Sequence, residues 1–280
     1  MHKITEAKKI ADTITRLSVE AKRIAKKRKA GQFVIVRESE GGERIPLTIV
    51  DSDPEGGTID IIVQAVGKTT TRISRLRSGD SLQDVAGPLG NPAHIEKYGT
   101  AVVIGGGVGV APMYPIAKAL QRKGNEIISI LGAQTAASLI LRDEMADLSS
   151  KVLVTTDDGS AGEKGFVTDA LKGLLNEKED IDFVFAVGPV VMMEAVCELT
   201  KKHEIPTMVS LNPIMIDGTG MCGGCRCTVG GEVKFACVDG PEFDGHLVDF
   251  KNLRQRLNMF KKHERQIHVG DGGCKLDGKV

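Results

Sequence analysis

Residues 216–237 read IDGTGMCGGCRCTVGGEVKFAC and hold four of the six cysteines of the chain. These four, Cys222, Cys225, Cys227 and Cys237, fall within sixteen residues and are interspersed with glycines. Glycine lets a backbone turn tightly and approach a bound group closely, because it has no Cβ. The stretch therefore predicts a compact loop that folds around something small.

The spacing of the thiols favours an iron–sulfur cluster. Plant-type [2Fe–2S] sites follow C-x4-C-x2-C with a distant fourth cysteine, and Cys222, Cys225 and Cys237 fill three of these positions. The first position is occupied by Asp217, so the predicted metal ligands are Asp217, Cys222, Cys225 and Cys237. Cys227 stays open as the fourth ligand in place of Asp217, because thiolate is the softer donor and residues two apart in an extended chain can point the same way.

Two other uses of the cysteines compete with the cluster. Disulfides need an oxidising compartment, and the N-terminus does not read as a signal peptide. Structural zinc sites usually combine two C-x2-C pairs, whereas only Cys222 and Cys225 form one here. We therefore expect a cluster in a cytoplasmic protein. A zinc-stabilised, nucleotide-binding regulatory module remains as a distant alternative from another functional class.

Composition excludes some partners. The chain has 37 basic and 37 acidic residues among 280, which argues against a general binder of nucleic acid or of anionic membranes. Its most apolar run, residues 101–117, contains glycines and prolines and reads as a strand followed by a loop instead of a membrane span. The length allows two or three domains, each with a core of its own.

The first ninety or so residues predict an antiparallel β barrel. Short apolar strands at 33–36, 44–50, 58–67 and 81–86 are separated by turn sequences. The basic run AKRIAKKRKAGQF at 21–33 is expected to be the solvated face of an edge strand.

From Gly99 onward, strands alternate with helices. This order predicts a parallel, doubly wound sheet that binds a nucleotide at the carboxyl ends of its strands. The predicted strands are 100–105, 126–132, 151–155, 183–188 and 207–212, and the predicted helices are 113–123, 138–148, 167–176 and 190–203. The predicted domains are a barrel at 1–98, an α/β domain at 99–212, a cluster domain at 213–250, and a helix and tail at 251–280.

A glycine loop follows the first strand of the α/β domain. Gly105, Gly106, Gly107, Val108 and Gly109 do not form a clean G-x-G-x-x-G motif, and no acid ends the next strand. Backbone N–H groups without side chains at a helix N-terminus nevertheless suit a pyrophosphate. Close packing of strand on helix is the alternative role for these glycines.

Several motifs, taken in order, resemble those of the ferredoxin–NADP+ reductase-like flavoproteins, over nearly the whole chain. They are Arg44-Ile45-Pro46-Leu47-Thr48, Gly87-Pro88-Leu89-Gly90, the loop Gly105–Pro112, and Gly188-Pro189 with Met192. A cluster loop after the nucleotide domain is similar to the electron-transfer subunits of dihydroorotate dehydrogenase B. Asp217, and the continuation of the chain through 250–280, bring it closer to the small subunits of bifurcating NADH-dependent ferredoxin–NADP+ oxidoreductases, also called sulfide dehydrogenases.

This resemblance implies FAD, NAD(H) and a [2Fe–2S] cluster as cofactors, with NAD(H) chosen over NADP(H) because the family implies it. It also implies no catalytic acid or base. The residues implied in cofactor binding are Arg44, Pro46, Leu47, Thr48, Val63, Gln64, Ala65, Gly67, Thr70, Gly87, Pro88, Leu89, Gly105, Gly106, Gly107, Val108, Gly109, Asp157, Gly188, Pro189 and Met192.

The implied function is that of an oxidoreductase subunit that relays electrons. It would take electron pairs from NAD(H) and pass them singly to a larger, glutamate-synthase-like flavo-iron–sulfur subunit, and through that partner to ferredoxin. The alternative is the electron-transfer subunit of NAD-dependent dihydroorotate dehydrogenase B. A predicted helix at 250–263, with Leu253, Leu257 and Phe260 on one face, would either contact the partner or cap its own core.

Overall fold

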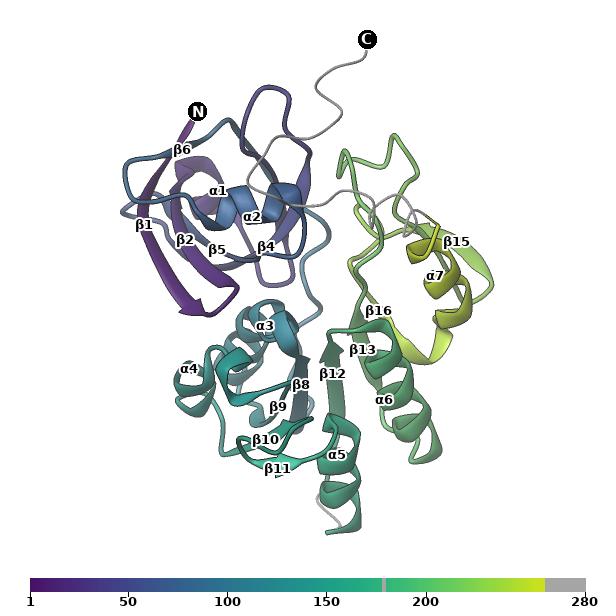
Figure 1. Cartoon of the computed structure of the whole chain (residues 1–280). Coiled ribbons are helices and arrows are strands. Elements are labelled where there is room, and N and C mark those ends of the chain that lie inside the picture. Colours follow the sequence, from purple (N-terminus) through teal and green to yellow (C-terminus); the bar gives the residue numbers. More distant parts are fainter. Residues whose placement is uncertain (178–179, 260–280) are drawn as a thin grey trace.

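The computed structural model of this chain describes residues 1–177 and 180–259, which form three lobes (Figure 1). An antiparallel sheet comes first, an α/β unit follows, and a small unit with a hairpin and a helix ends the described chain. Among the described residues no helix is both long and apolar enough to cross a membrane.

The first lobe is a seven-stranded antiparallel sheet that curls into a nearly closed barrel, with the order β6-β1-β2-β5-β4-β3-β7. Its interior is filled by isoleucine, valine and leucine side chains from every strand, which confirms the predicted barrel. The elements are β1 (His2–Ala11), β2 (Ile14–Glu20), α1 (Lys22–Lys27), β3 (Phe33–Arg37), β4 (Ile45–Asp53), β5 (Thr58–Gln64), α2 (Lys68–Ser74), β6 (Ser81–Leu82) and β7 (Asp84–Leu89).

The expectation of an edge strand in the basic run was wrong. Its first half is the short helix α1, in which Ile24 and Ala25 are buried against the barrel while the lysine side chains are exposed. A single apolar pair in a six-residue segment fits one and a half helical turns as well as a strand, so periodicity cannot separate the two.

The second lobe is the predicted doubly wound sheet, with the order β11-β10-β9-β8-β12-β13-β16. All neighbours pair in parallel except β16, which is antiparallel to β13. The elements are β8 (Thr100–Gly106), η1 (Gly107–Gly109), α3 (Val110–Arg122), β9 (Glu126–Ala133), η2 (Ala136–Ser138), α4 (Arg142–Ala146), β10 (Lys151–Thr156), β11 (Glu163–Lys164), α5 (Val167–Asn176), β12 (Phe183–Val187), α6 (Val190–Lys202) and β13 (Thr207–Ser210).

The order of these strands reverses once within the sheet. The chain runs outward from β8 to β9 and β10, then returns to the other side of β8 to form β12 and β13. Doubly wound sheets bind ligands where the order reverses in this way, at the carboxyl ends of the strands. Here that point lies between β8 and β12.

Two helices of this lobe differ from the prediction. Helix α3 begins at Val110, three residues before the predicted start, because it continues directly from the 3-10 turn η1. The helix predicted at 138–148 is reduced to α4. Leu141 precedes α4 with a φ of 53°, a left-handed conformation that interrupts a right-handed helix.

The third lobe packs on both others (Figure 1). Its elements are β14 (Arg226–Val229), β15 (Glu232–Phe235), β16 (Glu242–Asp244), η3 (Gly245–Leu247) and α7 (Phe250–Leu257). Strands β14 and β15 form a hairpin, whereas β16 joins the nucleotide-binding sheet. Phe33 and Ile35 of the barrel share one buried core with Cys225, Cys227 and Cys237. The predicted C-terminal helix is present as α7, which ends at Leu257 and is followed by a turn at Asn258 and Met259. The rest of the predicted range, 260–263 with Phe260, lies outside the described residues.

Ion pairs tie the barrel to the α/β lobe. Asp51 of β4 lies 2.7 Å from Nζ of Lys118 on α3 and 2.8 Å from Nη2 of Arg28. Burial acts to raise the pKa of Asp51, but the hydrogen bond from Lys118 and the nearby cations outweigh it and lower the pKa. The carboxylate therefore stays charged, and it fixes the two lobes relative to each other.

Glu242 lies where the three lobes meet. A Cβ added to Gly31 of the barrel would stand 2.6 Å from Oε1 of Glu242, so glycine leaves room for this carboxyl group. The charge of Glu242 also adds to the rise that burial causes in the pKa of Tyr98. Burial raises the pKa of Glu242 to about 8, so the group is largely protonated at neutral pH.

We expect the protein to lose stability as the pH rises from about 5 to 9, because Glu242 ionises near its ordinary pKa of 4.5 in the unfolded chain and only near 8 in the folded chain. The folded state binds the extra proton across this window, so its stability falls with rising pH. For one proton, the free energy of unfolding falls by at most about 1.4 kcal/mol per pH unit. We expect it to fall by about 2 kcal/mol in total, because the residue keeps some exposure.

Glu242→Gln should remove most of this loss, and urea unfolding at pH 6 and pH 9 measures it. Glu126→Gln, at an exposed position on β9, is the control and should leave the pH slope unchanged. A Glu242→Gln protein with the wild-type slope would contradict the assignment.

Candidate functional site

The predicted flavin-side residues form a row across three barrel strands. Phe33 of β3 pairs with Thr48 of β4 on one side and with Leu89 of β7 on the other. Pro46 pairs with Ile35, two residues further along the same two strands. The structure thus brings together motifs that lie about forty residues apart in the sequence (48 and 89).

Arg44 stands at the start of this row. It precedes β4 and is exposed, and no acidic side chain of the described chain pairs with it. Leu47, between Pro46 and Thr48, is half-buried at the edge of the barrel core. A guanidinium without a protein partner at the mouth of the barrel is well placed to bind an anionic or polar ligand group.

The residues predicted on β5 and α2 divide into two groups. Val63 is fully buried in the barrel core, so only its backbone can face a ligand, whereas Gln64 and Ala65 are half-buried. Thr70 acts within the protein: its hydroxyl accepts the N–H groups of Val66 and Gly67 at 3.1 and 3.0 Å. It therefore fixes the start of α2, whose first N–H groups have no partner within the helix.

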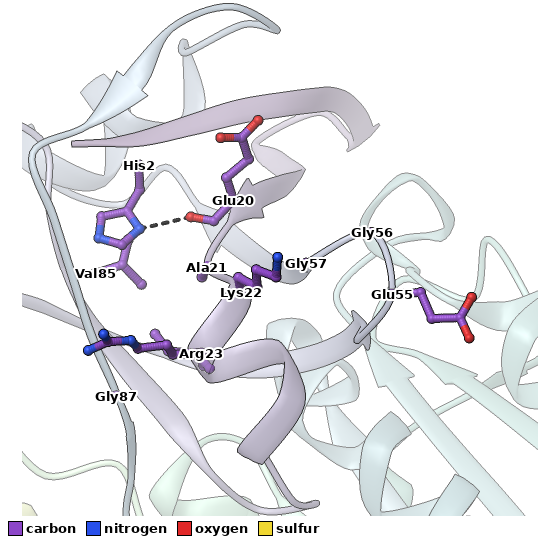
Figure 2. A pocket seen from close by; sticks show the side chains of 11 residues that line it. His2, Glu20, Ala21, Lys22, Arg23, Glu55, Gly56, Gly57, Val85 and Gly87 are labelled. Carbon is purple, nitrogen blue, oxygen red and sulfur yellow. Dashed lines mark hydrogen bonds between the residues drawn. The ribbon is translucent and has the colours of Figure 1, made fainter.

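Gly87 and Pro88 precede Leu89 on β7. A Cβ at Gly87 would lie 2.8 Å from Cγ1 of Val34, so the glycine lets β7 pack closely on β3. Gly87 also borders a cavity of about 530 Å³ beside α1 (Figure 2). None of the other predicted cofactor-binding residues lines this cavity; its walls are His2, Glu20, Ala21, Lys22, Arg23, Ile24, Glu55, Gly56, Gly57 and Val85.

The glycine loop and the Gly188-Pro189 segment meet at the carboxyl ends of β8 and β12. A Cβ on Gly106 would stand 2.5 Å from Sδ of Met192 and 3.0 Å from Cδ of Pro189. A Cβ on Gly109 would stand 2.4 Å from the carbonyl oxygen of Val187. The glycines therefore allow close packing here, and their role in binding a pyrophosphate at the start of α3 stays a prediction.

The loop after β10 approaches the same edge of the sheet. The backbone N–H of Asp157 donates to the carbonyl of Ala133 at the end of β9, at 3.1 Å. Asp158 is occupied by Ser160, whose N and Oγ donate to its carboxylate at 2.9 and 2.6 Å. The exposed Asp157 carboxylate has no such partner within the described chain, and it is available to accept from a ligand hydroxyl.

Asp217 is held in the cysteine loop by backbone donors. Its Oδ1 accepts the N–H of Thr219 at 3.1 Å and its Oδ2 accepts the N–H of Cys222 at 2.9 Å. The hydrogen bond from Thr219 is the main cause that lowers the pKa of Asp217. The carboxylate is therefore ionised, as a metal ligand must be.

The thiols of Cys225 and Cys237 lie together, with their sulfurs 3.2 Å apart. Burial, reinforced by the neighbouring Cys225, raises the pKa of Cys237, and the charge of Asp217 adds to this rise. Two sulfurs on one tetrahedral metal at about 2.3 Å lie about 3.8 Å apart, so this pair needs only a small opening to share a metal. Cys222, between them and Asp217, is exposed.

Cys227 is placed differently. It lies on β14, where it pairs with Lys234 of β15, and its buried Sγ approaches the carbonyl of that lysine at 3.6 Å. Burial raises its pKa to about 11. A thiol fixed in a strand and directed at a carbonyl supports Asp217 over Cys227 as the fourth ligand.

The cysteine loop carries three thiols and one carboxylate in a short segment. Gly218, Gly220 and Gly223 of this loop have positive φ, which lets the backbone turn tightly between the donors. Within residues 1–177 and 180–259, no three histidine, cysteine, aspartate or glutamate side chains lie close enough to hold a metal ion. Thiolates are the donors that iron–sulfur clusters use, so the chemistry of the set fits a cluster.

The cysteine loop also rests directly on the flavin-side row. A Cβ on Gly218 would stand 2.8 Å from both Cγ1 of Ile35 and Cδ1 of Leu89. Sequence reasoning identified Leu89 but missed Ile35 and Phe33, which look like ordinary strand residues. Only their register beside Thr48 and Leu89 reveals their position between the two sites.

The fourth ligand can be tested by comparing two substitutions. We expect Cys227→Ser to retain iron and an unchanged visible spectrum, because Cys227 bonds within the hairpin. Asp217→Cys should retain iron but shift the spectrum and the reduction potential, because ligand identity sets both. Iron analysis and spectropotentiometry make the measurement. Loss of iron from Cys227→Ser, with retention in Asp217→Ala, would reverse the assignment.

Two protein-family models match the chain. One, described as the iron–sulfur cluster binding domain of dihydroorotate dehydrogenase B, covers residues 212–249. The other, described as an oxidoreductase NAD-binding domain, covers residues 103–198. The first range contains the cysteine loop. The second runs from β8 into α6 and contains the glycine loop and the Gly188-Pro189 segment.

Several proteins are similar over most of their length. A Thermotoga maritima protein named as a homolog of the electron transfer subunit of dihydroorotate dehydrogenase B (NAD(+)) is 49% identical over 265 residues, covering 95% of this chain and 93% of that protein. The electron transfer subunit of dihydroorotate dehydrogenase B (NAD(+)) from Bacillus caldolyticus is 35% identical, covering 84% of this chain and 92% of that protein.

Solved structures agree with this grouping. A chain in the structure of an NADH-dependent reduced ferredoxin–NADP oxidoreductase, described for flavin-based electron bifurcation, superposes with a TM-score of 0.90 at 48% identity, covering 95% of this chain and 96% of that one. Phthalate dioxygenase reductase, at 17% identity and a TM-score of 0.60, covers 82% of this chain and 86% of its own, and shares the fold.

Proposed function

We propose that this chain, which belongs to the family of dihydroorotate dehydrogenase B electron-transfer subunits and their homologues, passes electrons between NAD(H), FAD and a [2Fe–2S] cluster and on to a larger partner subunit. It is an oxidoreductase subunit. The single observation that carries this proposal is the contact of Gly218, in the cysteine loop, with Ile35 and Leu89 of the flavin-side row. Electron transfer needs two redox groups close together, and this contact supports such an arrangement because it joins the predicted cluster loop to the predicted flavin-side strands.

The cofactors supply the redox chemistry when bound: FAD exchanges a hydride with NAD(H), and the flavin and the cluster then exchange single electrons. The protein binds and orients these groups, and no side chain need act as a general acid or base. Gly105–Gly109 would hold the pyrophosphate of the dinucleotide at the start of α3. Asp157 would accept from a ribose hydroxyl, and Arg44 and Thr48 would bind the flavin nucleotide.

The cluster would be held by Asp217, Cys222, Cys225 and Cys237. Cys222 is exposed while the other two thiols are buried, so one side of the cluster would face the outside of the protein. We propose four units for the chain: a FAD-binding barrel at 1–98, a nucleotide-binding domain at 99–212, a cluster domain at 213–250, and a helix and tail at 251–280. Because clusters bound by thiolates need reduced cysteines, we infer a cytoplasmic location.

Exposed apolar side chains around Cys222 support docking of the partner there. Met221 is 89% exposed, Ile216 54% and Val238 40%. Monomeric soluble proteins rarely leave such side chains grouped on the surface without a binding role. The similarity to the bifurcating oxidoreductase supports a glutamate-synthase-like flavo-iron–sulfur subunit as that partner, through which ferredoxin would exchange electrons.

A second candidate would use the same flavin- and nucleotide-binding residues. The family model at 212–249 and the named relatives support an electron-transfer subunit of dihydroorotate dehydrogenase B, in which the partner would be a dihydroorotate dehydrogenase. Asp217 at the first cluster position favours the bifurcating small subunit over this second candidate, and the partner that co-purifies distinguishes the two directly.

The test is anaerobic purification of the untagged partner together with this chain from its own cells. After separation from the partner, which in the first candidate would carry flavin and iron–sulfur groups of its own, we expect this chain to hold one FAD and two irons with acid-labile sulfide, and its flavin to be bleached by NADH. A glutamate-synthase-like partner supports the first candidate, and a dihydroorotate dehydrogenase supports the second. A colourless protein that contains zinc would overturn both.

A further inference from the structure

Arg256 reaches from the last turn of α7 to the cysteine loop. Its Nη2 donates to the carbonyl oxygen of Gly224 at 3.2 Å, and Gly224 lies in the turn between Cys222 and Cys225. Its Nε is buried and has no hydrogen-bond partner among the described residues. The guanidinium therefore lies against the loop that would hold the cluster.

The helix that carries Arg256 is firmly anchored. The N-cap residue Asp249 accepts the N–H of Asn252 at 2.8 Å, and Leu253 is fully buried. Arg254, two residues before Arg256, forms an ion pair with Glu194 of α6. The two arginines thus have different partners: Arg254 binds the nucleotide domain, and Arg256 binds the cysteine loop.

A buried guanidinium N–H without an acceptor is unfavourable, because the group gives up water and gains nothing in return. The nearest chemistry that would compensate it is negative charge in the cysteine loop. Thiolate ligands and a reduced cluster supply such charge, whereas neutral thiols do not. No hydrogen bond within the described chain therefore compensates the burial of the Arg256 Nε–H group.

We propose that Arg256 is a positioning residue for the cluster: it fixes the turn between Cys222 and Cys225 and favours the reduced state of the cluster over the oxidised state. This inference rests on the proposed function, since it requires a bound cluster. Reduction adds one electron, and hence one negative charge, with no bond made or broken in the protein. A fixed cation beside the loop stabilises that charge.

The experiment compares the purified, cluster-loaded proteins Arg256→Gln, Arg256→Lys and Arg254→Gln with the wild type. The midpoint potential of the cluster is measured by redox titration followed by electron paramagnetic resonance, and iron and sulfide are counted. We expect Arg256→Gln to lower the reduced-to-oxidised ratio about tenfold at the wild-type midpoint, a shift of about −59 mV for one electron. Arg256→Lys keeps the charge and should keep most of the potential.

Arg254→Gln is the matched control, since it removes one charge from the same helix but makes no contact with the loop. It should retain the wild-type potential. Loss of iron from Arg256→Gln but not from Arg254→Gln also supports the inference, because it shows that the contact with Gly224 holds the loop. An unchanged potential with full iron in Arg256→Gln, or equal effects in both variants, overturns it. A wild-type protein without a cluster would instead overturn the proposed function.

Discussion

Cys225→Ser should remove the iron–sulfur cluster and stop single-electron transfer, while the reaction of NADH with the flavin continues. Cys225 is buried and lies 3.2 Å from the sulfur of Cys237, so it anchors the centre of the ligand set. Removing a group that only hydrogen-bonds a metal ligand costs about 10–100-fold in metal affinity or activity, and removing a ligand itself costs more. We therefore expect reduction of a one-electron acceptor to fall by at least about 100-fold.

The measurement has three parts: iron and sulfide content, bleaching of the flavin by NADH in a stopped-flow instrument, and steady reduction of a one-electron acceptor. Cys197→Ser is the control, because Cys197 lies in α6 away from the loop and burial raises its pKa to about 12. It should keep all three. A Cys225→Ser protein with full iron, or one whose flavin no longer reacts with NADH, would contradict the separation of the two steps.

Arg44→Ala should weaken FAD binding strongly. Arg44 is exposed beside β4 and is paired with no acid in the described chain, so its guanidinium is available to a ligand. A hydrogen bond to a charged group contributes about 1.5–3 kcal/mol, which corresponds to an FAD dissociation constant raised by about 10–150-fold. The iron content should stay normal, because the cysteine loop is not altered.

FAD release on dilution, followed by flavin fluorescence, measures this effect. Arg23→Ala is the control: Arg23 is an exposed arginine on α1 that borders the cavity in Figure 2, away from the β4 motif. It should bind FAD as the wild type does. Equal weakening in both variants would mean that general charge, and not the Arg44 position, governs binding.

Local sequence patterns predicted the parts of the site that lie within one segment. The barrel, the doubly wound sheet and the cysteine loop all follow from signals spanning a few residues, such as Asp217-x4-Cys222-x2-Cys225. The sequence left Asp217 and Cys227 as alternatives for the fourth ligand, and the side chain of Cys227, turned toward Lys234, adds a structural reason to prefer Asp217.

Contacts between segments could not be predicted in this way. Phe33 and Ile35 connect the barrel to the cysteine loop only because of strand register, which depends on the whole sheet. Arg256 reaches Gly224 across thirty-two residues of chain, and nothing in its neighbours marks it apart from Arg254. The short helices were mispredicted for a different reason. Helices α1 and α4 have too few residues for a helical period of apolar side chains to show in the sequence.

Strand β16 limits how this polypeptide can be divided into separate modules. It is encoded after the cysteine loop, yet it completes the sheet that begins far earlier in the sequence. A protein truncated before Glu242 would leave β13 as an open edge, with unpaired backbone groups that promote aggregation. Grafting the cluster module onto another flavoprotein would therefore require transplanting β13 and β16 together.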